Sequence, residues 1–343
     1  MTRDRRLRVG SPCATLPAME RERTGRWAAH LICWLTFAVA TRGTSAQTEG
    51  TPVQADGVGL VVLGNVQDGG YPHIGCDRPD CRNLFLRPAT PHHVVSLGIV
   101  DRALGRQFLF EATPDLTRQA FLLSQEAGAH DGMPDGIFLT HAHLGHYSGL
   151  GFLGREAMGA NSVPVHAMPR LRGFLETNGP WQQLVTLNNI QLEGLQARRT
   201  EVLGPNLHVT PFLVPHRDEF SETVGYHIQG PNKSALFIPD IDKWSVWNQD
   251  VNAAIDSVDF AFLDGTFYDA EELGGHRDMA EIPHPFVLES VSKFSSLSAE
   301  NRDKVYFIHL NHTNALLDPN SKATQSVQDA GHHVARQGDR FEL

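Results

Sequence analysis

The sequence has few cysteines, no excess of basic residues and no series of apolar runs long enough to cross a membrane repeatedly. Four cysteines among 343 residues are too few for a scaffold built from disulfides. Asp and Glu outnumber Lys and Arg by 39 to 29, which gives a formal net charge of −10. An acidic chain gains no energy from neutralising phosphates, so we expect no nucleic-acid partner. The 41% of apolar residues is typical of a globular protein that buries a large core.

The first 46 residues differ in composition from the rest of the chain. Eight arginines stand against three acidic residues, and an apolar run over 28–40 precedes a small-residue junction at Ala46. A basic segment, a short apolar run and such a junction are the parts of a secretory signal. We therefore predict a leader over 1–46, with Met19 as an alternative start, and export of the domain 47–343 to the periplasm or the medium. An uncleaved leader that anchors the chain to a membrane is the alternative.

Cleavage of the leader would leave two cysteines, Cys76 and Cys81, separated by four residues. In an oxidising compartment this pair is suited to a local disulfide. It is also compatible with half of a structural metal site, although a closed zinc site needs four ligands. The sequence leaves both interpretations open.

From residue 58 onward, short apolar runs alternate with turn residues and helical patterns. The runs predict strands at 58–63, 94–100, 107–111, 136–140, 163–167, 207–214, 223–229, 234–239, 259–264 and 304–310. Apolar residues at helical spacing predict helices at 115–128, 169–177, 244–257 and 285–296. A glycine-rich turn at 67–70 follows the first strand. No repeat or low-complexity tract divides this stretch, so we expect one domain of strands and helices.

Three histidines form the strongest local motif, in Thr140-His-Ala-His-Leu-Gly-His146 directly after a predicted strand. The spacing allows the three imidazoles to converge, and neutral imidazole is a preferred ligand of zinc and iron. Other predicted strands also end in histidine or aspartate, at His216, Asp240, Asp264 and His309. Because α/β sheets place their sites at the carboxyl ends of strands, we expect these groups to share one site.

With these strand ends, the His-x-His-x-x-His pattern resembles the metallo-β-lactamase superfamily. The resemblance implies an α/β fold that is a four-layer αββα sandwich with one or two metal ions at one edge. Within the superfamily the chain resembles the pyrroloquinoline quinone biosynthesis protein B family and its uncharacterised relatives. The similarity is carried by short segments at 63–70, 113–115, 264–268, 277–279 and 309–314.

The resemblance also implies a set of metal ligands: His141, His143 and His216 for a first metal, His146 and His309 for a second, and Asp240 bridging the two. The superfamily usually has an aspartate ligand of the second metal just before the third histidine, where this chain has Gly145. We therefore expect a second site that lacks one ligand and an occupancy nearer one metal than two. Gly145→Asp is expected to tighten the second site.

Zinc favours a hydrolytic function. A bound zinc ion lowers the pKa of its water to about 7 and polarises the bond to be cleaved. We expect hydrolysis of a small ester, amide, lactone or phosphoester with one or two zinc ions, and we expect Asp218 or Asp242 to orient the water or a ligand histidine. His284 is expected to be an ordinary surface histidine, or at most a proton donor on the substrate side.

Two other functions stay open. Two histidines and a carboxylate, here His146, His309 and an acidic residue, are the ligands of many non-haem iron oxygenases. The family that the chain resembles is regarded as an iron-dependent hydroxylase in cofactor biosynthesis, which favours iron as the alternative metal. A carrier or scaffold that binds metal without turnover is the third interpretation.

The sequence contains few residues that indicate the substrate. The segment from Arg170 to Leu203 is expected to cover the site, with Phe174, Trp181 and Leu184 as an apolar wall. No basic cluster accompanies these residues, so a small molecule is a better substrate than a nucleic acid. The sequence does not indicate an oligomeric state.

Overall fold

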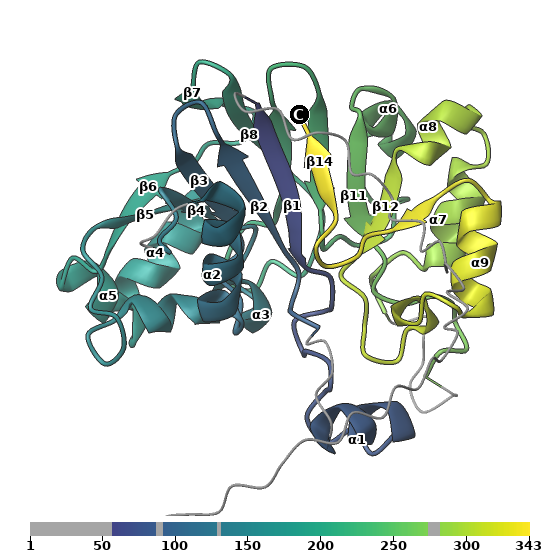
Figure 1. Cartoon of the computed structure of the whole chain (residues 1–343), viewed down its shortest axis with the longest axis horizontal. Coiled ribbons are helices and arrows are strands. Elements are labelled where there is room, and N and C mark those ends of the chain that lie inside the picture. Colours follow the sequence, from purple (N-terminus) through teal and green to yellow (C-terminus); the bar gives the residue numbers. More distant parts are fainter. Residues whose placement is uncertain (1–56, 87–91, 129–131, 274–281) are drawn as a thin grey trace, which may run out of the picture. The chain divides into compact units, whose positions relative to one another are not determined.

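The computed structural model describes residues 57–86, 92–128, 132–273 and 282–343, and the predicted leader and the segment 277–279 lie outside these ranges. Two seven-stranded sheets pack face to face and helices cover their outer faces (Figure 1). This is the expected αββα sandwich. Among the described residues, no helix combines the length and the apolar character needed to span a membrane.

Sheet 1 holds the N-terminal strands and the last strand of the chain. Its order is β14-β1-β2-β3-β4-β5-β6. The bounds are β1 Val58–Gly64, β2 Ser96–Asp101, β3 Arg106–Phe110, β4 Gly136–Phe138, β5 Val163–Ala167, β6 Ile190–Gly194 and β14 Arg340–Glu342.

Sheet 2 holds the C-terminal half. Its order is β13-β12-β11-β10-β9-β8-β7. The bounds are β7 Glu201–Gly204, β8 Leu207–Leu213, β9 Val224–Gln229, β10 Ser234–Ile238, β11 Phe260–Asp264, β12 Val305–Ile308 and β13 His333–Val334.

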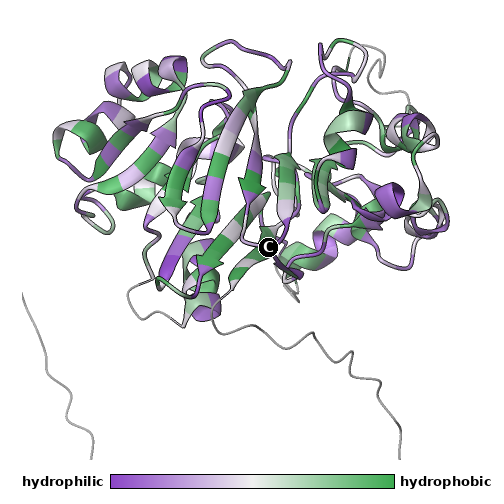
Figure 2. Ribbon diagram, turned by 90° about the horizontal axis from the view of Figure 1, so that it is seen from above, coloured by the Kyte–Doolittle hydropathy of each residue, from purple (hydrophilic) through white to green (hydrophobic). Residues whose placement is uncertain are grey.

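Helices flank the two sheets, and their polar faces point outward while hydrophobic residues gather in the strands and on the inner helix faces (Figure 2). Beside sheet 1 lie α2 Leu116–Ala127, α3 Leu144–Tyr147, η1 Ser148–Leu153, α4 Pro169–Thr177 and α5 Trp181–Thr186. Beside sheet 2 lie α6 Val251–Asp256, α7 Val287–Phe294, α8 Ala299–Asp303 and α9 Lys322–Asp329. Two further elements lie in loops: α1 Pro79–Leu86 and η3 Ala315–Leu317.

Aromatic side chains join the two sheets. Phe110 and Phe138 of sheet 1 stack with ring centroids 5.1 Å apart, and Tyr226 of sheet 2 meets the edge of both rings. The Tyr226 hydroxyl donates a hydrogen bond to the carbonyl of Leu139, so its one polar atom is satisfied inside the core. Buried aromatic rings of this size contribute a large share of the hydrophobic stabilisation of a core.

The predicted strands agree with the structure to within two residues at most ends. The helix predicted at 244–257 is wrong over its first half, because α6 begins only at Val251, with Asp250 accepting a hydrogen bond from the Asn252 amide. Trp244 and Trp247 give the segment a helical apolar spacing, but both are buried from the irregular segment before α6. Asp115 directly precedes α2, and its carboxylate accepts a hydrogen bond from the Val94 amide rather than capping the helix.

His166 on β5 gives a stability prediction. Its ring stacks on Phe138 with centroids 4.1 Å apart, and burial lowers its pKa to about 4. Between pH 6.5 and pH 4 the unfolded chain therefore binds more protons at this residue than the folded chain, so stability is lost as the pH falls through this window. We expect His166→Gln to remove on the order of 1 kcal/mol of the loss between pH 7 and pH 5. Urea unfolding of both proteins at the two pH values measures it, and equal losses would contradict the assignment.

Candidate metal centre

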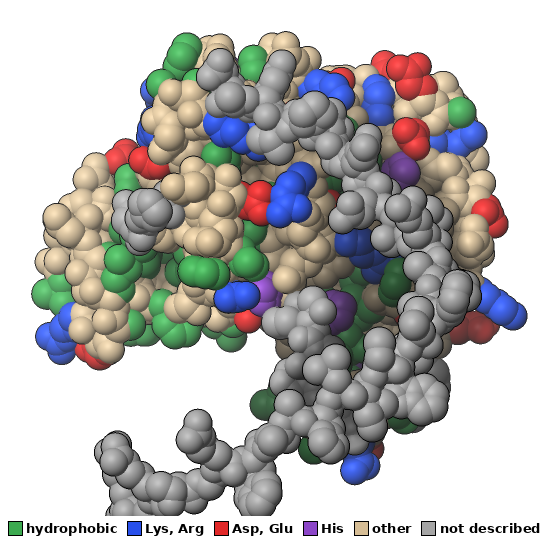
Figure 3. Space-filling view, in the orientation of Figure 1, with side chains coloured by type: hydrophobic (Ala, Val, Ile, Leu, Met, Phe, Trp, Pro, Cys, Tyr) green, Lys and Arg blue, Asp and Glu red, His purple; other side chains and the backbone are tan. Residues whose placement is uncertain are grey.

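The candidate site lies at the edge of the sandwich where strands of both sheets end. Strands β8, β10, β11 and β12 run in one direction, so their carboxyl ends lie together. His216 follows β8, Asp240 follows β10 and His309 follows β12. In sheet 1, β3 and the parallel β4 end near Glu111 and Thr140, where the three-histidine motif begins. The surface shows only a few histidine side chains (Figure 3), and His141, His146, His216 and His309 are buried.

Four predicted ligands form a first group. His141, His143, His216 and Asp240 place one ligand atom each within 4.8 Å of one another. Nδ1 of His143 lies 2.8 Å from Nε2 of His141 and 3.3 Å from Nε2 of His216. The Asp240 carboxylate lies 3.4 Å and 3.3 Å from the same two Nε2 atoms. A tetrahedral zinc ion with bonds of about 2.0–2.1 Å separates its ligand atoms by roughly 3.3 Å, so the group has the spacing of a metal site.

Each histidine of this group has its other ring nitrogen beside a polar side chain. The pairs are His141 Nδ1 with Thr140 Oγ1 at 2.8 Å, His216 Nδ1 with Asp242 Oδ1 at 3.1 Å, and His143 Nε2 with Glu219 Oε2 at 3.2 Å. Such partners fix the tautomer and the orientation of a ligand imidazole. The rings are therefore held with the remaining nitrogen toward the common centre.

His146, Asp240 and His309 form a second group that shares Asp240 with the first. Oδ2 of Asp240 lies 3.5 Å from Nε2 of His146 and 3.7 Å from Nε2 of His309. All three side chains are buried, and both Nε2 atoms have no hydrogen-bond partner. Buried polar atoms without partners are rare and costly. A metal ion between them would satisfy both, so the donor set fits a metal cofactor.

Glu111 belongs to this site, although the sequence analysis did not select it. Its buried carboxylate lies 3.3 Å from Nδ1 of His146 and accepts a 2.5 Å hydrogen bond from the Thr140 hydroxyl. Burial lowers the pKa of His146, but the carboxylates of Glu111 and Asp240 outweigh burial and raise this pKa to about 10. A metal at His146 therefore displaces a proton.

Two residues at these strand ends have a strained backbone. Glu111 and His309 have positive φ, 77° and 65°, although neither is a glycine. Such conformations cost about 1–3 kcal/mol each and persist only where the surroundings hold them. His309 is held through Nδ1, 2.8 Å from the Thr266 hydroxyl.

His284 is not the ordinary surface histidine expected from the sequence. Its side chain is 12% exposed, and Nδ1 lies 2.8 Å from Asp264 and 3.2 Å from Asp240. Burial lowers the pKa of His284, but the two carboxylates outweigh burial and raise it to about 9. No apolar strand precedes His284, so the strand-end pattern did not select it.

The two predicted catalytic carboxylates lie in different positions. Asp242 contacts His216, as described above, and its side chain is 25% exposed. Asp218 is exposed, and its Oδ1 accepts a hydrogen bond from the Thr223 hydroxyl, 3.1 Å away. Asp242 therefore touches a predicted ligand, His216, whereas the hydrogen bond of Asp218 is to its own loop.

Of the three residues of the segment from Arg170 to Leu203 that were expected to form an apolar wall, Leu184 does not, because it is buried in the core. The segment builds α4, α5 and β6, and this part of the core lies between these helices and sheet 1. Phe174 and Trp181 pack on Tyr147 of α3, with ring centroids 5.5 Å and 4.8 Å away. Their role is to support α3, the helix that carries His146.

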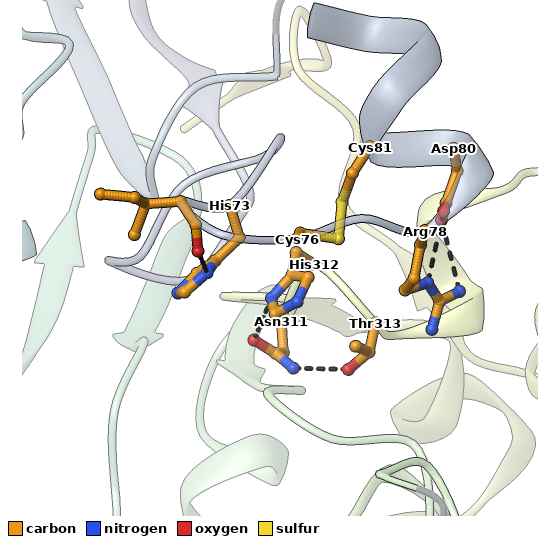
Figure 4. Close-up of a disulfide and its surroundings, with 9 residues drawn as sticks. His73, Cys76, Arg78, Asp80, Cys81, Asn311, His312 and Thr313 are labelled. Atoms are coloured by element: carbon orange, nitrogen blue, oxygen red, sulfur yellow. Dashed lines mark hydrogen bonds and ion pairs between the residues drawn. A yellow bond between two sulfur atoms is a disulfide. The ribbon is translucent and has the colours of Figure 1, made fainter.

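Cys76 and Cys81 form a disulfide with Cα atoms 6.1 Å apart, which decides between the two interpretations of the pair. The disulfide joins the loop after β1 to the first turn of α1 (Figure 4). In the same loop, His73 stacks on His312 with ring centroids 4.3 Å apart. Burial lowers the pKa of His312 to about 4. Asp240, Asp264 and His284 form a third group that could hold a metal, and within the described residues His312 is part of none of the three groups.

Gly145 lies in α3 and its φ is outside the left-handed region. The requirement for glycine is steric. A Cβ atom at this position would lie 1.7 Å from the Cβ of Asp68, far inside contact distance. The expectation that an aspartate fits at position 145 is therefore wrong.

Sequence and structure comparisons agree with this geometry. The model of the beta-lactamase superfamily domain matches residues 106–309, more than half of the chain. Coenzyme PQQ synthesis protein B of Xanthomonas campestris pv. campestris (strain B100) is 24% identical over 312 residues, covering 83% of this chain and 99% of the relative. The same protein of Methylobacterium radiotolerans is 26% identical over 310 residues, covering 81% and 98%.

Solved structures show the same fold. Zn(2+)-bound PqqB from Methylobacterium extorquens superposes with a TM-score of 0.68 at 21% identity, covering 83% of this chain and 100% of that one. A diphosphatase from the PhnP family superposes with a TM-score of 0.57 at 22% identity, covering 83% and 97%. With its αββα sandwich and its histidine and aspartate groups at one edge, the chain belongs to the metallo-β-lactamase superfamily.

Proposed function

We propose that the chain is a metal-dependent hydrolase that acts on a small ester, amide, lactone or phosphoester. The observation that carries the proposal is the convergence of five histidines and Asp240, of which His146 and His309 have buried Nε2 atoms without hydrogen-bond partners. His141, His143, His216 and Asp240 would hold a first metal ion, and His146, His309 and Asp240 a second. A metal bound there supplies a nucleophilic hydroxide near neutral pH and polarises the bond to be cleaved.

The side chains around the ligands have positioning roles. Asp242, Thr140 and Glu219 hold the outer nitrogens of the first-group histidines. Glu111 and Thr266 do the same for His146 and His309. His284 lies between Asp240 and Asp264 and orients the shared carboxylate. Loss of such a partner typically costs 10–100-fold in metal affinity or activity.

Metal analysis and a substrate panel test this proposal. The protein is purified without added metal, its metal content is measured, and it is assayed with an activated carboxylic ester, an activated amide, a lactone and an activated phosphodiester. Zinc with hydrolysis of one of these classes supports the proposal. A protein that binds no metal after reloading, or that binds zinc tightly and hydrolyses none of the classes, contradicts it.

An iron-dependent oxygenase is the second candidate. The observation that favours it is the second group, whose two histidines and one carboxylate match the ligands of non-haem iron oxygenases. The similarity to coenzyme PQQ synthesis protein B, which covers 99% of that relative, is in keeping with a role in cofactor biosynthesis. Iron in the purified protein together with substrate-dependent oxygen consumption would select this candidate over hydrolysis.

We also propose that the domain is exported. The basic and apolar leader supports this, and so does the Cys76–Cys81 disulfide, because disulfides persist mainly in oxidising compartments. Mass spectrometry of the mature protein tests the proposal. An N-terminus near Gln47 is expected, and a cytoplasmic protein that begins at Met1 or Met19 would contradict it.

A further inference from the structure

We propose that Asp68, in the turn after β1, is the carboxylate ligand of the second metal that Gly145 cannot supply. This inference rests on the proposed metal-dependent function. It assigns a ligand from a segment distant in sequence from the three-histidine motif. It also explains why the motif carries a glycine where the superfamily usually has an aspartate.

The first argument is the position of the Asp68 side chain. A Cβ built on Gly145 falls 1.7 Å from the Cβ of Asp68, 2.3 Å from its Cα and 3.0 Å from its Cγ. The side chain of Asp68 therefore starts almost at the point where the side chain of an aspartate at position 145 would start. One carboxylate can occupy this space, and in this chain it comes from the turn.

The second argument is the anchoring of the turn to the strand end that carries His309. The amide of Leu310 donates to the carbonyl of Asn65, and the amide of Gln67 donates to the carbonyl of Leu310, both at 2.8 Å. The Gly70 amide then closes the turn onto the carbonyl of Gln67 at 2.8 Å, with Gly70 at φ 78°. Asp68 therefore lies in a turn whose backbone is hydrogen-bonded to Leu310, the residue that follows His309.

The third argument is that the second group offers only three ligand atoms to a metal ion. His146 and His309 are buried with free Nε2 atoms, and together with Asp240 they give three ligand atoms. Asp68 is half-buried, and a Cβ on Gly145, the residue directly before His146, would touch its side chain. The Asp68 carboxylate is not among the atoms grouped within 4.8 Å, so coordination requires it to turn about its own side-chain bonds.

The test measures metal binding to the full chain rather than turnover. Metal-free protein is titrated with zinc in competition with a chromophoric chelator, and with cobalt(II) followed by its visible absorption. We expect two bound metals for the parent. Asp68→Asn, which keeps the shape of the side chain, and Asp68→Ala should leave the affinity for the first metal within about twofold and weaken the second by about tenfold or more. Asp77→Asn, which removes an equal charge from an exposed position of the same loop, should leave both unchanged.

The possible outcomes separate this inference from the proposed function. A parent with two metals whose second affinity is unchanged in both Asp68 variants overturns the assignment of Asp68 and leaves the hydrolase proposal intact. A parent that binds only one metal also overturns it, because a completed second site should fill. A parent that binds no metal overturns the proposed function itself. Near-UV circular dichroism of each variant checks that a weaker second metal does not reflect a damaged fold.

Discussion

Asp240→Asn is expected to abolish tight metal binding at both halves of the site. Asp240 is the one residue common to all three metal-compatible groups, and its side chain is 4% exposed. Burial opposes its ionisation, but the imidazoles of His216, His309 and His284 hold its pKa well below the usual range. An asparagine of the same shape supplies no charge, and its amide nitrogen cannot act as a ligand. We expect metal affinity to fall by more than the roughly 100-fold that loss of an outer partner can cause.

Isothermal titration with zinc measures this loss, and hydrolytic activity should fall with it. The matched control is Asp259→Asn, because Asp259 lies just before β11, at the opposite end of sheet 2, where it accepts the Ser234 amide. The control should keep its metal, with at most a small decrease in stability. If Asp240→Asn binds two metals as tightly as the parent, the shared carboxylate is not a ligand and the proposed centre is wrong.

The convergence of the candidate ligands was predictable because most of them follow apolar strands. Parallel strands bring their carboxyl ends to one edge, so His216, Asp240 and His309 could be grouped before their contacts were known. Glu111 also follows a strand, yet its role depends on a positive φ and on a contact with His146 that no local pattern encodes. His284 reaches the site from a loop, and the sequence offers no periodic signal for it.

The fold was predictable to the extent that its strands are long and apolar. All six residues of β2 and all seven of β1 are buried, which gives continuous apolar runs. Strands β13 and β14 have two and three residues, so their pattern is too short to distinguish from a turn. The error at Trp244 and Trp247 has a different cause, because a spacing of three residues is helical but large aromatic side chains are also buried from irregular segments.

Gly145→Asp is expected to destabilise the protein and to lose the second metal, the reverse of what the resemblance alone implied. The new Cβ would lie 1.7 Å from the Cβ of Asp68, and overpacking of this kind typically costs about 1–3 kcal/mol, with larger values for contacts that cannot relax. Deleting the Asp68 side chain would not remove the conflict, since the Cα of Asp68 would still lie 2.3 Å away. Relief requires the whole turn to move away from Leu310, to which it is hydrogen-bonded.

Urea unfolding and zinc titration of the same samples measure both effects. The matched control is Gly151→Asp in the adjacent η1, where an added Cβ has no atom within 4 Å, so its stability should stay within about 0.5 kcal/mol of the parent. Gly145→Ala should be destabilised like Gly145→Asp, because the clash begins at Cβ and does not depend on charge. If Gly145→Asp instead folds as stably as the parent and binds the second metal more tightly, the turn at Asp68 moves away from position 145 at little cost in stability. The second site would then be one ligand short, and Asp68 would not be the residue that completes it.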